Sequence, residues 1–82
     1  MKPIDPDNIE FGGPATYRII VRGSLDPQWS DRMAGLEIAT TGEVEGVIRT
    51  TLVGRIHDQA ELKGVLDTLY GLHLPILQVE TV

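Results

Sequence analysis

One amphipathic helix, enclosed by segments that alternate like β-strands, constrains the fold of this chain more than any other feature. Asp58 and Glu61 have the spacing of a capping box, in which Asp58 caps free amide groups and Glu61 reaches back to the Asp58 amide. Apolar residues then recur at helical spacing, at Leu62, Val65, Leu66 and Leu69. Gly71 is the expected C′ residue, with Leu72 folding back on Leu66 in a Schellman-type end. The pattern predicts a helix with one apolar face between Asp58 and Gly71.

Four segments around this helix are typical of strands. In residues 16–22, Tyr17, Ile19 and Val21 alternate with polar residues, which indicates a strand with one buried face. Further strands are expected over 36–41, 45–56 and 74–82, with a hairpin over 41–46. Pro75 cannot donate to a sheet, so it indicates an edge strand or the first residue of the last strand.

A short helical turn is expected between the first two strands. Asp26 is suited to cap it, because Pro27 then occupies the first helical position, where its missing N–H has no cost. Gly35 leaves room for only one or two turns. Trp29 and Met33 are four residues apart, so they are expected on the same side.

The element order is therefore strand, short helix, strand, strand, helix, strand. This order predicts an α+β fold of the ferredoxin-like or ACT-like kind, β(short helix)ββαβ, with a four-stranded antiparallel sheet and one main helix. The domain is expected over residues 16–82. Residues 1–15 are rich in proline and glycine and are expected to form a flexible arm. The stunted first helix is expected to leave part of the sheet thinly covered.

Composition excludes several classes of protein. The formal net charge of -5 argues against a nucleic-acid or membrane-surface partner, because both present negative charge. The absence of cysteine rules out disulfides and thiolate metal sites, and 82 residues allow only one small core. We expect a cytoplasmic protein because the N-terminal segment lacks the apolar run of a signal peptide. Association of subunits is then the expected support for the core.

Much of the chain resembles a set of short, uncharacterised bacterial proteins. The resemblance rests on Val21-Arg22-Gly23-Ser24-Leu25, on Trp29, on Thr51-Leu52-Val53-Gly54, on the helix from Asp58 to Leu66, and on Leu72-His73-Leu74. The Asp58-Gln59-Ala60 helix start is its most specific part. The resemblance implies no activity. The element order is also similar to that of ACT-type regulatory domains, which is an analogy of fold only.

Several residues are candidates for binding or association. The predicted ligand-binding residues are Trp29, Arg22, Asp58 and Gln59, at the loop 23–35 and the helix start. The predicted oligomer-interface residues are Trp29, Met33, Gly64 and Ile20. Gly64 either allows close approach of another backbone or is an exposed, tolerated glycine. The strand arginines either form a basic stripe for an anion or, as we favour, pair with Glu37, Glu45 and Glu80; these arginines are Arg18, Arg22, Arg49 and Arg55.

Three functions follow from these observations. The leading hypothesis is a non-catalytic homo-oligomer, a dimer as the first expectation, that acts through structural or regulatory contacts. The second is an ACT-like module that binds a small metabolite. The third is a small enzyme that uses His57 or His73, although these histidines flank opposite ends of the helix and His57 is better explained as a loop residue beside the Asp58 cap. No catalytic residue, metal ligand or cofactor is predicted.

Overall fold

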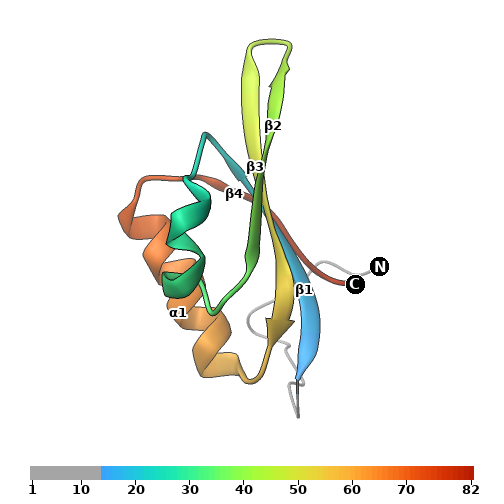
Figure 1. Ribbon diagram of the computed structural model, residues 1–82, viewed down its shortest axis with the longest axis vertical. Helices are drawn as coiled ribbons and strands as arrows, with labels where there is room; N and C mark the ends of the chain where they lie inside the picture. The colour runs from blue at the N-terminus through green and yellow to red at the C-terminus, as the bar shows by residue number, and fades with distance from the viewer. Residues whose placement is uncertain (1–13) are drawn as a thin grey trace.

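The protein forms a four-stranded antiparallel sheet with helical elements on one face. The structure, a computed structural model, describes residues 14–82, so the predicted arm at 1–15 lies almost wholly outside the described residues. The elements are β1 (Ala15–Arg22), η2 (Pro27–Arg32), β2 (Glu37–Val44), β3 (Val47–Ile56), α1 (Gln59–Gly71) and β4 (Ile76–Thr81). The strand order is β2-β3-β1-β4 (Figure 1). The predicted α+β fold with one main helix is confirmed, and its order is that of a split βαβ.

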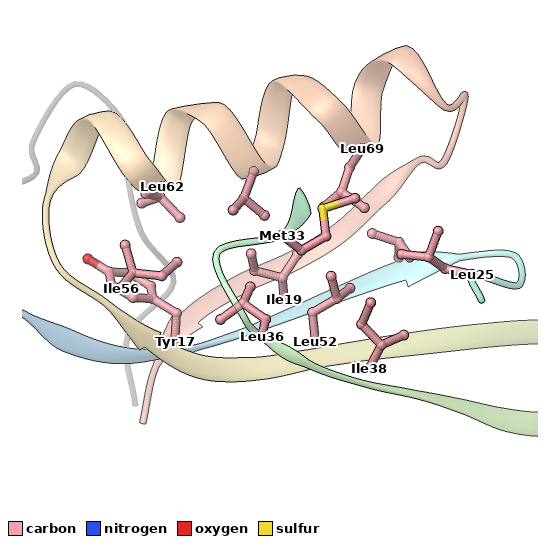
Figure 2. Close-up of a cluster of buried hydrophobic side chains, with 12 residues drawn as sticks. Tyr17, Ile19, Leu25, Met33, Leu36, Ile38, Leu52, Ile56, Leu62 and Leu69 are labelled. Carbon is pink, nitrogen blue, oxygen red and sulfur yellow. The ribbon is translucent and has the colours of Figure 1, made fainter. Parts of the chain in front are cut away.

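The core lies between α1, η2 and the face of the sheet that the strand alternation predicted (Figure 2). Tyr17, Ile19 and Val21 of β1 are buried, as expected from their spacing. The helix contributes Leu62, Val65 and Leu69, while the expected stripe residue Leu66 is only partly buried. The remaining fully or nearly buried apolar residues are Leu25, Met33, Leu36, Ile38, Leu52 and Ile56.

The segment around η2 covers more of the sheet than its length suggests. Asp26 caps the short helix by accepting a hydrogen bond from the Gln28 amide at 2.9 Å, which confirms the predicted cap. Met33 and Leu36, which follow η2, have 0% exposure. Leu36 packs directly on Gly54 of β3, where an added Cβ would lie 2.8 Å from Leu36 Cδ2. The glycine therefore allows the segment after η2 to lie close against the central strands.

On the face of the sheet that carries the helical elements, the hairpin that joins β2 and β3 is left uncovered (Figure 1). Figure 1 shows this hairpin extending beyond both helical elements. The predicted loop over 41–46 was too long, since only Glu45 and Gly46 turn the chain, with φ values of 52° and 77°. Two positive φ values match the twist of a tight antiparallel hairpin. Ile48, the second residue of β3 after this turn, is 38% exposed.

The end of α1 differs from the predicted one by two residues. Gly71 is still helical, and His73 adopts the left-handed conformation with φ of 58°. The His73 amide donates to the Tyr70 carbonyl at 3.0 Å, and the Leu74 amide donates to the Leu69 carbonyl at 3.2 Å. These two bonds make a Schellman motif with His73 at C′. The motif was predicted correctly, but the residue that carries it was wrong, since a non-glycine residue accepts the strain.

Replacing His73 with glycine should stabilise the protein by about 0.5–1 kcal/mol, because glycine adopts positive φ without a Cβ clash. Gly71→Ala should also stabilise, by up to about 1 kcal/mol, because Gly71 is helical and an added Cβ would meet nothing within 4 Å. Urea unfolding of each variant measures both effects. Destabilisation by Gly71→Ala would instead place the left-handed residue at position 71.

Gly23 connects the end of β1 to the core. Its amide donates to the Ile48 carbonyl at 2.8 Å, and its carbonyl accepts a hydrogen bond from the Thr50 hydroxyl at 2.6 Å. Its φ is 115°, and an added Cβ would lie 2.9 Å from Leu74 Cδ2. Glycine at this position lets the chain leave β1 while both of its backbone groups stay paired.

Gly23→Ala should therefore lower the free energy of unfolding by about 1–3 kcal/mol, because alanine is strained at this φ. Gly42→Ala is the matched control, since no atom lies within 4 Å of its added Cβ and its φ is not positive. The control should change stability by less than about 0.5 kcal/mol. Equal effects of the two substitutions, measured by chemical unfolding, would contradict the assignment.

Candidate functional site

The four predicted ligand-binding residues do not converge on one pocket. Ala15, the first residue of β1, pairs with Ile56, which lies two residues before Asp58. Arg22 ends the same strand, and seven residue steps of a strand span about 23 Å. Asp58 and Gln59 therefore lie beside one end of β1, and Arg22 lies at the other. A single small molecule does not contact all three residues.

Trp29 lies on η2 and is half-buried against the core. The Arg32 guanidinium carbon lies 5.1 Å from the centre of its ring, within the range of a cation–π contact. Together with Asp26 and Gln28, these two residues line a surface depression of about 280 Å³. Neither Arg22 nor Asp58 lines it. Trp29 thus packs partly against the core. The residues that line the depression with it are not the other predicted ligand-binding residues.

The predicted interface residues are also dispersed. Met33 is fully buried, so in this fold its side chain is part of the core. Gly64 is exposed on α1, and an added Cβ there would meet nothing within 4 Å, so no close approach occurs within the described fold. Ile20 is half-buried and lies on the sheet face opposite the helices, since its β1 neighbours Ile19 and Val21 are buried beneath α1.

His57 completes the cap of α1. Asp58 accepts a hydrogen bond from the Glu61 amide at 2.8 Å, as predicted. The Glu61 carboxylate, however, accepts from the His57 amide at 3.0 Å and lies 3.1 Å from His57 Nδ1, instead of reaching the Asp58 amide. Glu61 therefore binds the amide one residue before the one that the predicted capping box assigned to it. These bonds, the backbone bond first, hold the pKa of Glu61 below its usual value of 4.5.

The lowered pKa gives a pH dependence with a definite sign. The Glu61 carboxylate is favoured in the folded state, so its contribution to stability is present above pH 4.5 and is lost as pH falls through the lowered pKa. Wild type should melt at a higher temperature than Glu61→Gln at pH 7, and the difference should shrink as pH falls below 4.5 and through the lowered pKa. Thermal melts at a series of pH values from 7 downward measure it, with Glu45→Gln in the hairpin turn as a control. A difference that does not depend on pH would contradict this role.

The sheet face opposite the helices, which we call the open face, carries most of the arginines. Alternation along the paired strands places Arg18 and Arg22 of β1 and Arg49 and Arg55 of β3 on this face. Of the predicted cross-strand ion pairs, only that between Arg18 and Glu80 forms among residues 14–82. Glu80 is 4% exposed and also accepts a hydrogen bond from the Gln78 amide group at 2.8 Å.

The other three pairings were wrong. Arg22 lies directly opposite Arg49, so each arginine faces a like charge across the strand pair. Arg55 lies opposite Thr16. Glu45 is displaced into the hairpin turn, and Glu37 lies opposite Val53. The strand register, which the sequence left open, decides these partners.

Residues 16–80 match a family described as a domain of unknown function (DUF8691). The chain belongs to this family. No curated protein and no solved structure matched the chain. The match covers the fold except for Ala15 at the start of β1 and Thr81 at the end of β4, which agrees with the resemblance to uncharacterised proteins that the sequence predicted.

Two further observations bear on the class of site. Among the residues that the structure describes, no group of three or more histidine, aspartate and glutamate side chains could hold a metal ion. Within the same residues, no helix is long and apolar enough to cross a membrane. His57 and His73 lie just outside the two ends of α1, whose 13 residues span about 20 Å, so they do not form a pair.

Proposed function

We propose that this DUF8691 domain is a homodimeric module that acts through structural or regulatory contacts, and that two copies join along the edge of β4. The supporting observation is that apolar exposure gathers at this strand. Ile76 is 38% exposed and Leu77 is 48% exposed, and Val82 just after the strand is 64% exposed. Tyr70, on the last turn of α1, is 80% exposed and lines an apolar depression with Leu74 and Pro75.

Within residues 14–82, the backbone of β4 also offers unpaired groups at this edge. The Val82 amide donates to the Thr16 carbonyl at 2.9 Å, which sets the alternation of the ladder between β1 and β4. In an antiparallel pair, every second residue points its amide and carbonyl toward the neighbouring strand. The backbone groups of Val79 and Thr81 therefore point away from β1. An exposed row of such groups is a template for another strand.

A second copy of the chain is the occupant that suits this edge. An edge strand can pair antiparallel with its own copy about a twofold axis. Each amide and carbonyl that one copy offers then meets the matching group of the other copy. A register with Val79 on the axis places Gln78 of one copy opposite Glu80 of the other, so an amide donor meets a carboxylate. A register with Glu80 on the axis would oppose two carboxylates, which is unfavourable.

The other edge of the sheet is less suited to pairing. β2 carries Glu37 and Glu43, and its pairing with β3 is irregular between Thr41 and Val44. Charged side chains and irregularities both discourage edge pairing. The β4 ladder has an irregularity of its own at Leu77, between the pairs of Gln78 and Ile76, but no charged residue occupies that end of the strand.

A charge at Leu77 should disrupt the dimer while leaving the fold intact, since the side chain is half exposed. Leu77→Lys should raise the dimer dissociation constant at least about tenfold, because a lysine at an edge must be desolvated on pairing. Light scattering coupled to size exclusion, at micromolar protein concentration, measures the mass of each variant. Val44→Lys, at an apolar residue of the hairpin that is 60% exposed, is the matched control and should remain dimeric.

Either of two results would reject this proposal. A wild-type chain that is a monomer at micromolar concentration rejects the dimer itself. A dimer that survives Leu77→Lys but is lost in Val44→Lys places the contact at the hairpin and rejects the β4 edge.

A further inference from the structure

The open face carries a pair of arginines whose placement is unfavourable for folding alone. Arg22 and Arg49 are direct partners on β1 and β3, and both are exposed. The Arg22 amide donates to the Pro75 carbonyl on the β4 side at 2.9 Å, so Arg22 and Arg49 form a pair that shares no backbone hydrogen bonds. Side chains lie closest in such pairs. Their Cβ atoms are then about 5 Å apart, and like charges at this position destabilise a sheet.

Among the residues that the structure describes, no acidic group pairs with either arginine to offset this repulsion. Within residues 14–82, no carboxylate oxygen lies within the 4.0 Å ion-pair distance of either guanidinium, and neither side chain has another partner. The chain as a whole has 12 acidic and 7 basic residues, so acids to pair with them are abundant. On the open face itself, however, the paired strand positions hold only Glu37 and Glu80 as acids, and Glu80 is bound to Arg18.

We infer that Arg22 and Arg49 together bind the doubly charged phosphate group of a small molecule. Two guanidinium groups from opposed positions can each donate two parallel hydrogen bonds to one phosphate, and the dianion cancels the repulsion between them. The next pair along the same face is Ile20 opposite Thr51, both half-buried, which offers a flat and partly apolar surface beside the phosphate. A polyanion such as nucleic acid is disfavoured because the whole chain carries a net charge of -5.

Phosphate binding is tested by titrating the ¹⁵N-labelled protein with inorganic phosphate and, separately, with phenyl phosphate at constant ionic strength. The Nε–Hε signals of Arg22 and Arg49 and the amide signals of Ile20 and Thr51 should shift together and saturate. Tighter binding of phenyl phosphate identifies a phosphate ester as the ligand, and equal binding identifies free phosphate. Both results support the assignment.

Substitutions test whether phosphate binds this pair and not the other arginines. Arg22→Gln and Arg49→Gln should each weaken phosphate binding at least about tenfold, because each removes charge-assisted hydrogen bonds to the anion. Both should also raise the melting temperature, since each removes the like-charge contact, so lost binding will not reflect lost folding. Arg55→Gln is the matched control on the same strand and face. It should bind phosphate as wild type does.

Three outcomes would overturn the inference. Shifts that rise without saturation indicate an adventitious ion only, as do equal shifts at Arg32, Arg55 and the Arg22–Arg49 pair. Unchanged binding in Arg22→Gln excludes the pair as the site. The titration is repeated with Leu77→Lys, so that a failure of the proposed dimer and a failure of phosphate binding are observed separately.

Discussion

Burial of one helical stripe against one face of the sheet is the interaction on which the rest of this structure depends. Leu62 and Leu69 of α1 lie over Tyr17 and Ile19 of β1 and their neighbours (Figure 2), and Val65 belongs to the same buried cluster. Each such side chain contributes about 1.5–3 kcal/mol when it leaves water. A helix of 13 residues is about 20 Å long and about 10 Å wide, so it cannot cover four strands alone. The segment around η2 supplies the remaining cover through Met33 and Leu36.

Close packing of that segment explains the glycines. Gly54 gives room to Leu36, and Gly23 turns the chain out of β1 with both of its backbone groups paired. Both glycines lie in short sequence motifs, Gly23 in residues 21–25 and Gly54 in residues 51–54. Packing explains why both residues are glycine, because a side chain at either position would meet a leucine. The motifs therefore describe the fold more directly than they describe a function.

The surfaces outside this core differ in chemistry. The edge of β4 combines exposed apolar residues with outward backbone groups, which favours another strand. The open face gathers arginines in a chain whose overall charge is negative. We propose the first surface for a second copy of the chain and the second for an anion. They do not overlap, because Arg22 and Arg49 lie on the central strands, whereas Leu77 lies on the edge.

The sequence by itself determined the element order, the buried face of β1, the two helix caps at Asp26 and Asp58, and the acidic balance. These features depend on neighbours within a few residues, whose periodicity and hydrogen bonds are local. Local signals were less accurate where two residues could take the same role. At the end of α1, His73 and not Gly71 adopts the left-handed conformation that ends the helix. They were least informative for the candidate site. Only the tertiary structure placed Arg22 far from Asp58 and directly opposite Arg49, because strand register is set by packing of the whole sheet on its helices.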